Sequence, residues 1–498
     1  MQLDRASTGI VGLDDVLGGG FPRGQLFLVE GNPGAGKTTL GLQFLLEGIR
    51  NGERCCYVAL AESEKALRRL AASHGFDITG LDVIESNDQA SVTDYTIYQP
   101  SEVELGETSR ALLARLDEIK PQRVVLDSLS ELRLMSQDPL RYRRLLLGLR
   151  KHFDDRGTTT LLIDFLSDVA DRQLESLCHG IVHLDQLVPE YGGMRRRLRV
   201  SKLRESAFRD GFHDFAIRSG GMEVFPRLVA AEHDREHEFV VDTVSSGVPE
   251  IDALLGGGLD RGTSTLILGP AGAGKSTLAA QLAKANVERG EKAAFFIFDE
   301  VPNTLVVRGE GMGMGVRKHV EAGRMIIRQV DPAELSPGHF AHLVRQAVER
   351  DGASMVVIDS VNGYQSAMPE EHHLSAHLHE LLAYLNQSNV LSVLVMTQSG
   401  LVGATQSPID LSYLADTVVL LRYFEAHAEI RQAISVVKRR TGPHERWIRE
   451  LRIDGNGLRV GEPLRDFLGI MTGNLIYSGG ETMLNARGER EAPRQHGT

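Results

Sequence analysis

A short glycine-rich pattern, G-x-x-x-x-G-K-[ST], occurs twice in this chain and constrains its fold more than any other feature. The first copy spans residues 31–38, and the second spans residues 269–276. Each copy follows an apolar run and precedes a segment with helical periodicity. A glycine-rich turn between a strand and a helix directs backbone N–H groups and the positive end of the helix dipole toward an anion. Both copies are therefore predicted to be phosphate-binding loops.

The residue types within each loop have distinct predicted roles. Lys37 and Lys275 are expected to reach the β- and γ-phosphates of ATP, and the hydroxyls of Thr38 and Ser276 to ligate Mg²⁺. The other expected nucleotide contacts are Gly31, Asn32, Pro33, Gly34, Ala35, Gly36 and Thr39 in the first loop, and Gly269, Pro270, Ala271, Gly272, Ala273, Gly274 and Thr277 in the second.

The sequence around the loops repeats with them. Four pairs of matching residues are Lys37 and Lys275 (238 positions apart), Glu62 and Glu300 (238), Asp127 and Asp359 (232), and Lys202 and Lys438 (236). A nearly constant offset predicts a tandem duplication of one domain, and the period is far too long for a solenoid repeat. We expect domains at residues 1–232 and 239–478, a charged linker between them, and a disordered tail at 479–498.

Each half alternates apolar strands with helices. After the loop, strands are expected at 55–60, 123–127 and 159–163 in the first half, and at 293–298, 355–359 and 392–396 in the second. Antiparallel segments, 180–187 with 198–203 and 416–423 with 433–438, are expected to close each half. Continuous apolar strands indicate a parallel sheet covered by helices on both faces. The predicted fold class is therefore α/β, with two tandem nucleotide-binding domains.

Acidic residues follow several of these strands. Asp127 and Asp359 end apolar strands, where a carboxylate in a nucleotide-binding domain faces Mg²⁺. Glu62 in the first half, and Asp299 with Glu300 in the second, follow the strand after the loop helix. A carboxylate at that point can take a proton from an attacking water or hydroxyl, so these residues are candidate catalysts.

A K-x-R pattern follows the last closing strand of each half. It comprises Lys202 with Arg204, and Lys438 with Arg440. Residues two apart on a strand face the same side, so each pair projects together. Two cations directed at a γ-phosphate would stabilise its developing charge as an arginine finger does, and we predict that role for both pairs.

These residues together resemble the KaiC family of RecA-like ATPases, which includes the circadian-clock ATPase and kinase and its bacterial relatives. The resemblance covers about residues 5–478 and rests on S-T-G-I-x-G-L-D at 7–14, L-G-G-G-F-P-R-G at 17–24, the two loops, the Asp-Ser pairs at 127–128 and 359–360, the K-x-R patterns, and D-T-V-V-L-L at 416–421. It implies a homohexameric double ring of RecA-like domains, with ATP bound between neighbouring subunits and the K-x-R residues acting in trans.

The resemblance also implies a chemistry for each ring. The N-terminal ring of such proteins is chiefly an ATPase, whereas the C-terminal ring also phosphorylates a pair of hydroxyl residues just before the strand at Asp416. Here the pair is Ser412 and Tyr413, where the clock protein has Ser and Thr. Ser412 fits the acceptor position, and Tyr413 is the weaker candidate. A second departure is Ala61 before Glu62, where the family has tandem glutamates.

The composition of the chain argues against several classes of function. The net charge of −12 argues against bulk nucleic-acid binding, and three cysteines without C-x-x-C spacing predict no disulfide framework and a reducing cytoplasm. Apolar runs are too short to span a membrane. The expected function is an ATP-hydrolysing autokinase or signalling hexamer with regulatory protein partners. The alternatives are a RecA-like motor on DNA, and a scaffold in which ATP only joins subunits.

Overall fold

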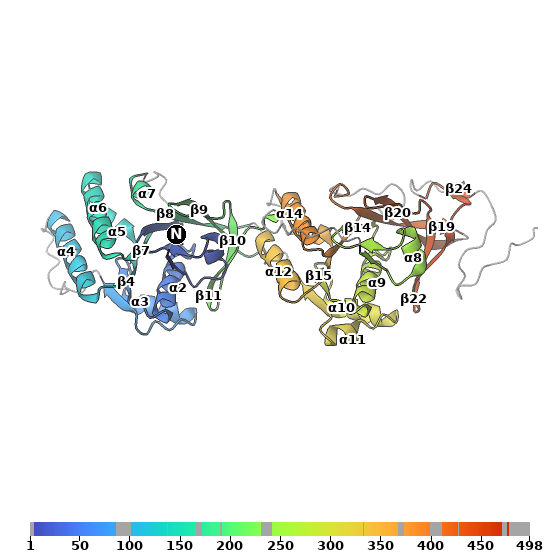
Figure 1. The fold of residues 1–498 in the computed structure, drawn as a ribbon, viewed down its shortest axis with the longest axis horizontal. Helices are drawn as coiled ribbons and strands as arrows, with labels where there is room; N and C mark the ends of the chain where they lie inside the picture. The colour runs from blue at the N-terminus through green and yellow to red at the C-terminus, as the bar shows by residue number, and fades with distance from the viewer. Residues whose placement is uncertain are drawn as a thin grey trace, which may run out of the picture. The chain divides into compact units, whose positions relative to one another are not determined.

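The computed structural model describes residues 4–85, 101–136, 138–165, 172–189, 192–230, 242–331, 333–366, 373–398, 411–426, 428–470 and 476–477. The chain divides into two compact units, Met1–Arg227 and Leu228–Thr498 (Figure 1). The predicted boundary region after Ala230 and the predicted tail at 479–498 lie outside the described residues. The predicted domain limits therefore remain predictions.

One nine-stranded sheet forms the centre of the first unit. In spatial order its strands are β11 (Gly221–Phe225), β10 (His213–Arg218), β9 (Arg195–Leu203), β8 (Gly180–Leu187), β3 (Leu26–Gly31), β7 (Thr159–Phe165), β6 (Arg123–Asp127), β4 (Cys55–Ala59) and β5 (Asp82–Glu85). The strands from β8 to β5 are parallel, whereas β9, β10 and β11 are antiparallel additions.

The second unit repeats this sheet. Its strands, in the matching spatial order, are β22 (Gly457–Pro463), β21 (Arg449–Asp454), β20 (Glu429–Arg439), β19 (Thr417–Ala426), β14 (Ser264–Gly269), β18 (Leu391–Thr397), β17 (Met355–Asp359), β15 (Ala293–Ile297) and β16 (Met325–Gln329). The order of connections is the same as in the first unit. The predicted duplication is confirmed at the level of topology.

Helices follow the strands in both units. Those of the first are α1 (Leu13–Val16), α2 (Lys37–Arg50), α3 (Glu64–Ser73), α4 (Ser101–Ile119), α5 (Leu129–Ser136), α6 (Pro139–Arg156) and α7 (Arg172–Leu177). Those of the second are α8 (Pro249–Leu254), α9 (Lys275–Glu288), α10 (Pro302–Gly311), α11 (Val316–Glu321), α12 (Pro337–Glu349), α13 (Val361–Ser366) and α14 (Leu374–Gln387). Short strand pairs complete the list: β1 (Arg5–Ala6) with β2 (Phe21–Pro22), β12 (Thr243–Val244) with β13 (Leu259–Asp260), and β23 (Phe467–Leu468) with β24 (Ile476–Tyr477).

The central strands of each sheet are buried on both faces. In β3, Phe27 contributes to the hydrophobic cluster that contains Phe44 of α2, whereas Leu28 contributes to the cluster on the other face with Phe153 of α6. Successive residues of a strand point to opposite faces, so an apolar run such as β3 supplies both clusters. The second unit has the same division across β14, which confirms the predicted α/β architecture. No helix among the described residues has the length and apolar character needed to cross a bilayer.

Candidate functional site

Both glycine-rich loops lie at the carboxyl ends of the central strands, β3 and β14, and lead into α2 and α9. The helices begin after Gly36 and Gly274, whose φ angles of 103° and 97° are in the left-handed region. A Cβ atom at Gly36 would lie 2.5 Å from Cδ1 of Ile217, and one at Gly274 would lie 2.2 Å from Cδ1 of Ile453. Glycine is therefore required at both positions by conformation and by space.

The loop lysines are buried and fold back over their own loops. Nζ of Lys37 donates hydrogen bonds to the carbonyl oxygens of Gly31 (2.6 Å) and Asn32 (3.0 Å), and Nζ of Lys275 donates to that of Pro270 (2.8 Å). Burial lowers the pKa of both side chains, that of Lys275 to about 8. An anionic phosphate beside either amine would restore the charged form, since an opposite charge favours ionisation.

The residues predicted to face Mg²⁺ come together in both units. In the first, Oγ1 of Thr38 donates to Oδ2 of Asp127 (2.9 Å), and the hydroxyl of Tyr57 donates to the same oxygen (2.5 Å). In the second, Asp359 is buried beside Ser276, and burial raises the pKa of its carboxyl group.

The carboxylate of Asp359 also has a buried oxygen, Oδ2, without a hydrogen-bond partner in the described part of the chain. Mg²⁺ is bound in such sites through one or two carboxylates together with substrate phosphates. An unsatisfied carboxylate oxygen beside a loop hydroxyl fits this ion. No cluster of three or more His, Cys, Asp or Glu side chains suited to a metal occurs among the described residues.

The three acids predicted to be catalysts lie in different surroundings. Glu62 is exposed at the turn before α3, whereas Glu300 is half-buried and forms an ion pair with Arg308 of α10. Asp299 accepts a hydrogen bond from Oγ of Ser360. Burial is the main cause of the raised pKa of Asp359, and the charge of Glu300 adds to it, so the two predicted site residues lie within electrostatic range of each other.

The first K-x-R pair lies away from the loop of its own unit. The backbone N–H of Arg204 bonds to the carbonyl of His179, whose own N–H bonds to the carbonyl of Leu26. Leu26 is the first residue of β3 and Gly31 is the last, so the pair lies at the amino edge of the sheet and the loop at the carboxyl edge. At roughly 3.3 Å per residue the separation along the strand alone is about 16 Å. Nζ of Lys202 donates to the carbonyl of Glu175 (2.7 Å).

The second K-x-R pair contacts the turn that carries the predicted phosphoryl acceptors. Nζ of Lys438 donates to the carbonyl of Ser412 (2.7 Å), and Nη2 of Arg440 donates to that of Tyr413 (2.7 Å). Ser412 is half-buried and Tyr413 is 57% exposed. Asp416, which follows the turn, accepts from the backbone N–H of Ser264 (3.0 Å) at the amino end of β14. The acceptor turn and its cations therefore also lie at the amino edge, opposite the loop.

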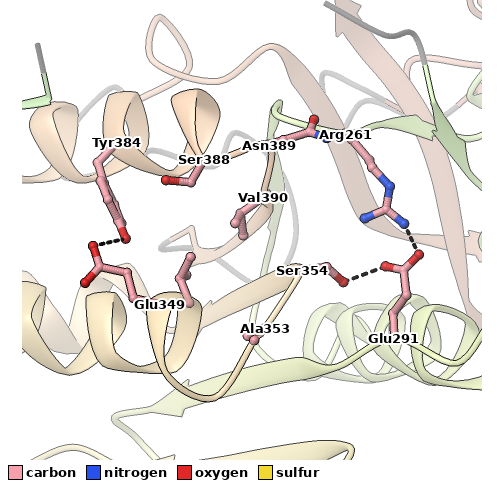
Figure 2. A pocket seen from close by; sticks show the side chains of 11 residues that line it. Arg261, Glu291, Glu349, Ala353, Ser354, Tyr384, Ser388, Asn389 and Val390 are labelled. Carbon is pink, nitrogen blue, oxygen red and sulfur yellow. Dashed lines mark hydrogen bonds and ion pairs between the residues drawn. The ribbon is translucent and has the colours of Figure 1, made fainter. Parts of the chain in front are cut away.

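Figure 2 shows a cavity of about 510 Å³ in the second unit. Its lining includes Arg261, Ser354 and Val390, which precede β14, β17 and β18, so it lies at the same amino edge. Its polar lining is largely paired internally: Glu291 contacts Arg261 and accepts from Oγ of Ser354 (2.5 Å), and the hydroxyl of Tyr384 donates to Glu349 (3.1 Å) (Figure 2). The phosphate loop contributes none of its lining. This cavity is therefore separate from the predicted nucleotide-binding loop of the second unit.

Sequence patterns did not indicate two of the side chains described above. Tyr57 lies inside an apolar strand and Arg308 inside an amphipathic helix, so neither belongs to a recognisable motif. Arg308 differs between the two halves of the sequence: it lies eight positions after Glu300, whereas the residue eight positions after Glu62 is Leu70. That difference is the one feature of the sequence that could have drawn attention to Arg308.

Comparisons with known proteins show which family matches the two halves of the chain. A family profile described as "ATPase: KaiC" matches residues 6–229 and again residues 244–465. The chain is 26% identical over 492 residues to the "Circadian clock protein KaiC3" of Synechocystis sp., covering 96% of this chain and 95% of that protein. It is 27% identical over 489 residues to the "Circadian clock oscillator protein KaiC" of Prochlorococcus marinus, covering 95% and 96% of the two chains.

Proposed function

We propose, from the premise that this chain belongs to the KaiC family of ATPases, that both of its units bind and hydrolyse ATP within a homohexameric double ring. One observation carries the proposal. Each unit has a phosphate loop at one edge of its sheet and a K-x-R pair at the other edge. The loop and the pair of one unit are therefore too far apart to contact the same nucleotide. Stacking identical units around a ring would bring the cations of one copy to the nucleotide of the next.

The chain's own residues have distinct parts in the proposed hydrolysis. Lys37 and Lys275 bind the phosphates, while Thr38 with Asp127 and Ser276 with Asp359 would hold Mg²⁺. Bound Mg²⁺ would neutralise charge on the phosphate oxygens. Glu62 and Glu300 take the proton of the attacking water, Asp299 supports Glu300, and the neighbour's Lys and Arg pair stabilises charge on the γ-phosphate.

The second unit is proposed to be an autokinase as well. Its acceptor is Ser412, with Tyr413 as the weaker candidate, and the phosphoryl group comes from ATP bound to a neighbouring subunit. The contacts from Lys438 and Arg440 to the acceptor turn support this proposal, because cations that reach a neighbour's γ-phosphate would bring Ser412 toward it. We further propose a signalling or timing role in the cytoplasm with regulatory protein partners. The three buried, unpaired cysteines are consistent with a reducing compartment.

Incubation with Mg-ATP followed by phosphopeptide mass spectrometry tests the autokinase. Phosphate on Ser412 that disappears in Glu300→Gln would support the proposal, whereas a wholly unmodified Ser412 and Tyr413 would overturn it. Size-exclusion chromatography tests the assembly: a hexamer is expected with ATP, and a monomer at all nucleotide concentrations would contradict the ring.

A further inference from the structure

Three polar side chains form a connected row across neighbouring strands of the first unit. Nε2 of His183, on β8, lies 2.7 Å from Oγ of Ser201 on β9. Nδ1 of the same ring lies 2.6 Å from Oε1 of Glu30 on β3, as an ion-pair contact without hydrogen-bond geometry. His183 is buried, Glu30 is half-buried, and Ser201 is exposed to solvent. A hydroxyl, an imidazole and a carboxylate in this sequence are the groups that activate an oxygen nucleophile.

The fold does not require this row. In the second unit Leu268 pairs with Leu420 in the register in which Glu30 pairs with His183. Val437 stands where the first unit has Ser201, because each is the residue before the lysine of the K-x-R pair. Apolar side chains therefore satisfy the same three strand positions, and the polar row is a specific property of the first unit.

A bulge in β9 places Ser201 beside Lys202. Val200 pairs with Val182 and Lys202 pairs with Ile181, so Ser201 is the extra residue between them. Ser201 contacts His183, which lies on the same face of β8 as Ile181 because the two are separated by one residue. The exposed hydroxyl and the ammonium of Lys202 therefore lie on one face of the sheet, although adjacent residues of a regular strand would not.

We propose that Ser201 is a second phosphoryl acceptor of this protein and receives the γ-phosphoryl group of ATP bound to a neighbouring copy. The proposal rests on the proposed function, in which Lys202 contacts the neighbour's γ-phosphate. Oγ of Ser201 forms a bond to the γ-phosphorus, and the bond from that phosphorus to the β–γ bridging oxygen breaks. ADP leaves with the electron pair, the hydroxyl proton passes to Nε2 of His183, and Glu30 stabilises the resulting imidazolium.

The first experiment incubates the full chain with Mg-ATP and measures ADP release and phosphate on the Ser201 peptide in parallel. The structure predicts phosphoserine at 201, none in Ser201→Ala, and formation about 100-fold slower in His183→Leu. Leucine is the residue that the second unit uses at this position, so the substitution is compatible with the sheet. ADP release without phosphate at Ser201 overturns the inference and leaves the ATPase proposal standing, whereas absence of both overturns both.

The second experiment needs no nucleotide. A fluorophosphonate probe reacts covalently with activated serine hydroxyls, and peptide mapping of the nucleotide-free protein locates the adduct. Labelling of Ser201 that is lost in His183→Leu and in Glu30→Leu would support activation by the row. Equal labelling of the parent chain and these variants, or no labelling at Ser201, would contradict it.

Discussion

Arg308 contacts both carboxylate oxygens of Glu300: Nη1 lies 2.8 Å from Oε2, and Nη2 lies 2.7 Å from Oε1. Glu300 follows β15, and Arg308 lies on α10, which begins two residues after Glu300. A carboxylate whose two oxygens both accept from one guanidinium must lose at least one of these bonds before it can take a proton from water. The ion pair with Arg308 therefore reduces the availability of Glu300 as the proposed base of the second unit. Glu62 of the first unit has Leu70 at the matching helical position, which cannot form such a pair.

Replacing Arg308 by Leu is predicted to raise ATP turnover at the second site about fivefold, since a partly exposed ion pair is worth about 1 kcal/mol. The variant should be measured in a Lys37→Ala background, which removes turnover by the first site. KM should stay unchanged because Arg308 is not proposed to bind nucleotide. In Glu300→Gln the same substitution should have no effect on turnover, and an equal gain there would mean that Arg308 acts by another route.

The nucleotide affinity of the second site is predicted to weaken as the pH rises above 8. The pKa of Lys275 is lowered to about 8 by burial, and phosphate favours its charged form. Above pH 8 the free protein increasingly carries the neutral amine, so binding must take up a proton and Kd should rise about tenfold per pH unit. Titration of a fluorescent ATP analogue between pH 7 and 9.5 in Lys37→Ala measures this. A flat profile would contradict the prediction.

A buried ion pair in the first unit is predicted to control its acid stability. Nε and Nη2 of the fully buried Arg123 each lie 2.8 Å from a carboxylate oxygen of Glu53, and these bonds help to lower the pKa of Glu53 to about 2, against desolvation. A carboxyl with a lowered pKa stabilises the fold above its unfolded value near 4.5, and this contribution is lost as pH falls toward 2.

Glu53→Gln should therefore cost the first unit about 3 kcal/mol at pH 7, because it leaves a buried guanidinium without its countercharge. Arg123→Met is the matched control, since Met355 occupies the corresponding strand position of the second unit. It should cost less, because Glu53 keeps its ion pair with Arg23. Chemical denaturation from pH 7 to pH 3 measures both. Equal losses in the two variants would show that packing rather than charge dominates.

Action of the K-x-R pairs across a subunit boundary can be tested by mixing two defective chains. Lys275→Ala lacks a functional second loop, and Arg440→Ala lacks a cation for its neighbour's nucleotide. In randomly mixed rings about a quarter of the interfaces combine an intact loop with an intact arginine, so turnover at the second site should return to roughly that fraction. Turnover that stays at the level of the separate variants would place Arg440 outside the neighbour's site. Both chains carry Lys37→Ala so that only the second site is measured.

Much of the scaffold could be predicted from the sequence because its signals are local. The strands at 123–127 and 355–359 have the predicted bounds, since they are short apolar runs that end in Asp. The edge strands β5 and β16 were not predicted. Asp82–Glu85 is short and partly exposed, so it has no continuous apolar run, and its strand conformation depends on pairing with β4.

Relationships across the sheet could not be predicted in this way. Glu30, His183 and Ser201 are far apart in the sequence and meet only because β8 lies between β3 and β9. The location of the loop and the K-x-R pair at opposite edges of the sheet likewise depends on strand direction and register, which residue spacing alone does not reveal. The sequence identified the loops, acids and K-x-R pairs of the proposed nucleotide sites, whereas the row of Glu30, His183 and Ser201 is seen only in the structure.

The most direct test of the central claim is steady-state ATP turnover by the full chain carrying both Glu62→Gln and Glu300→Gln. The substitutions remove the proposed proton acceptors while leaving the phosphate loops unchanged. We predict that ATP still binds with similar affinity and that turnover falls at least about 100-fold, in line with the usual contribution of a general base. Unchanged turnover would contradict the assignment of these glutamates and favour a scaffold in which ATP only joins subunits.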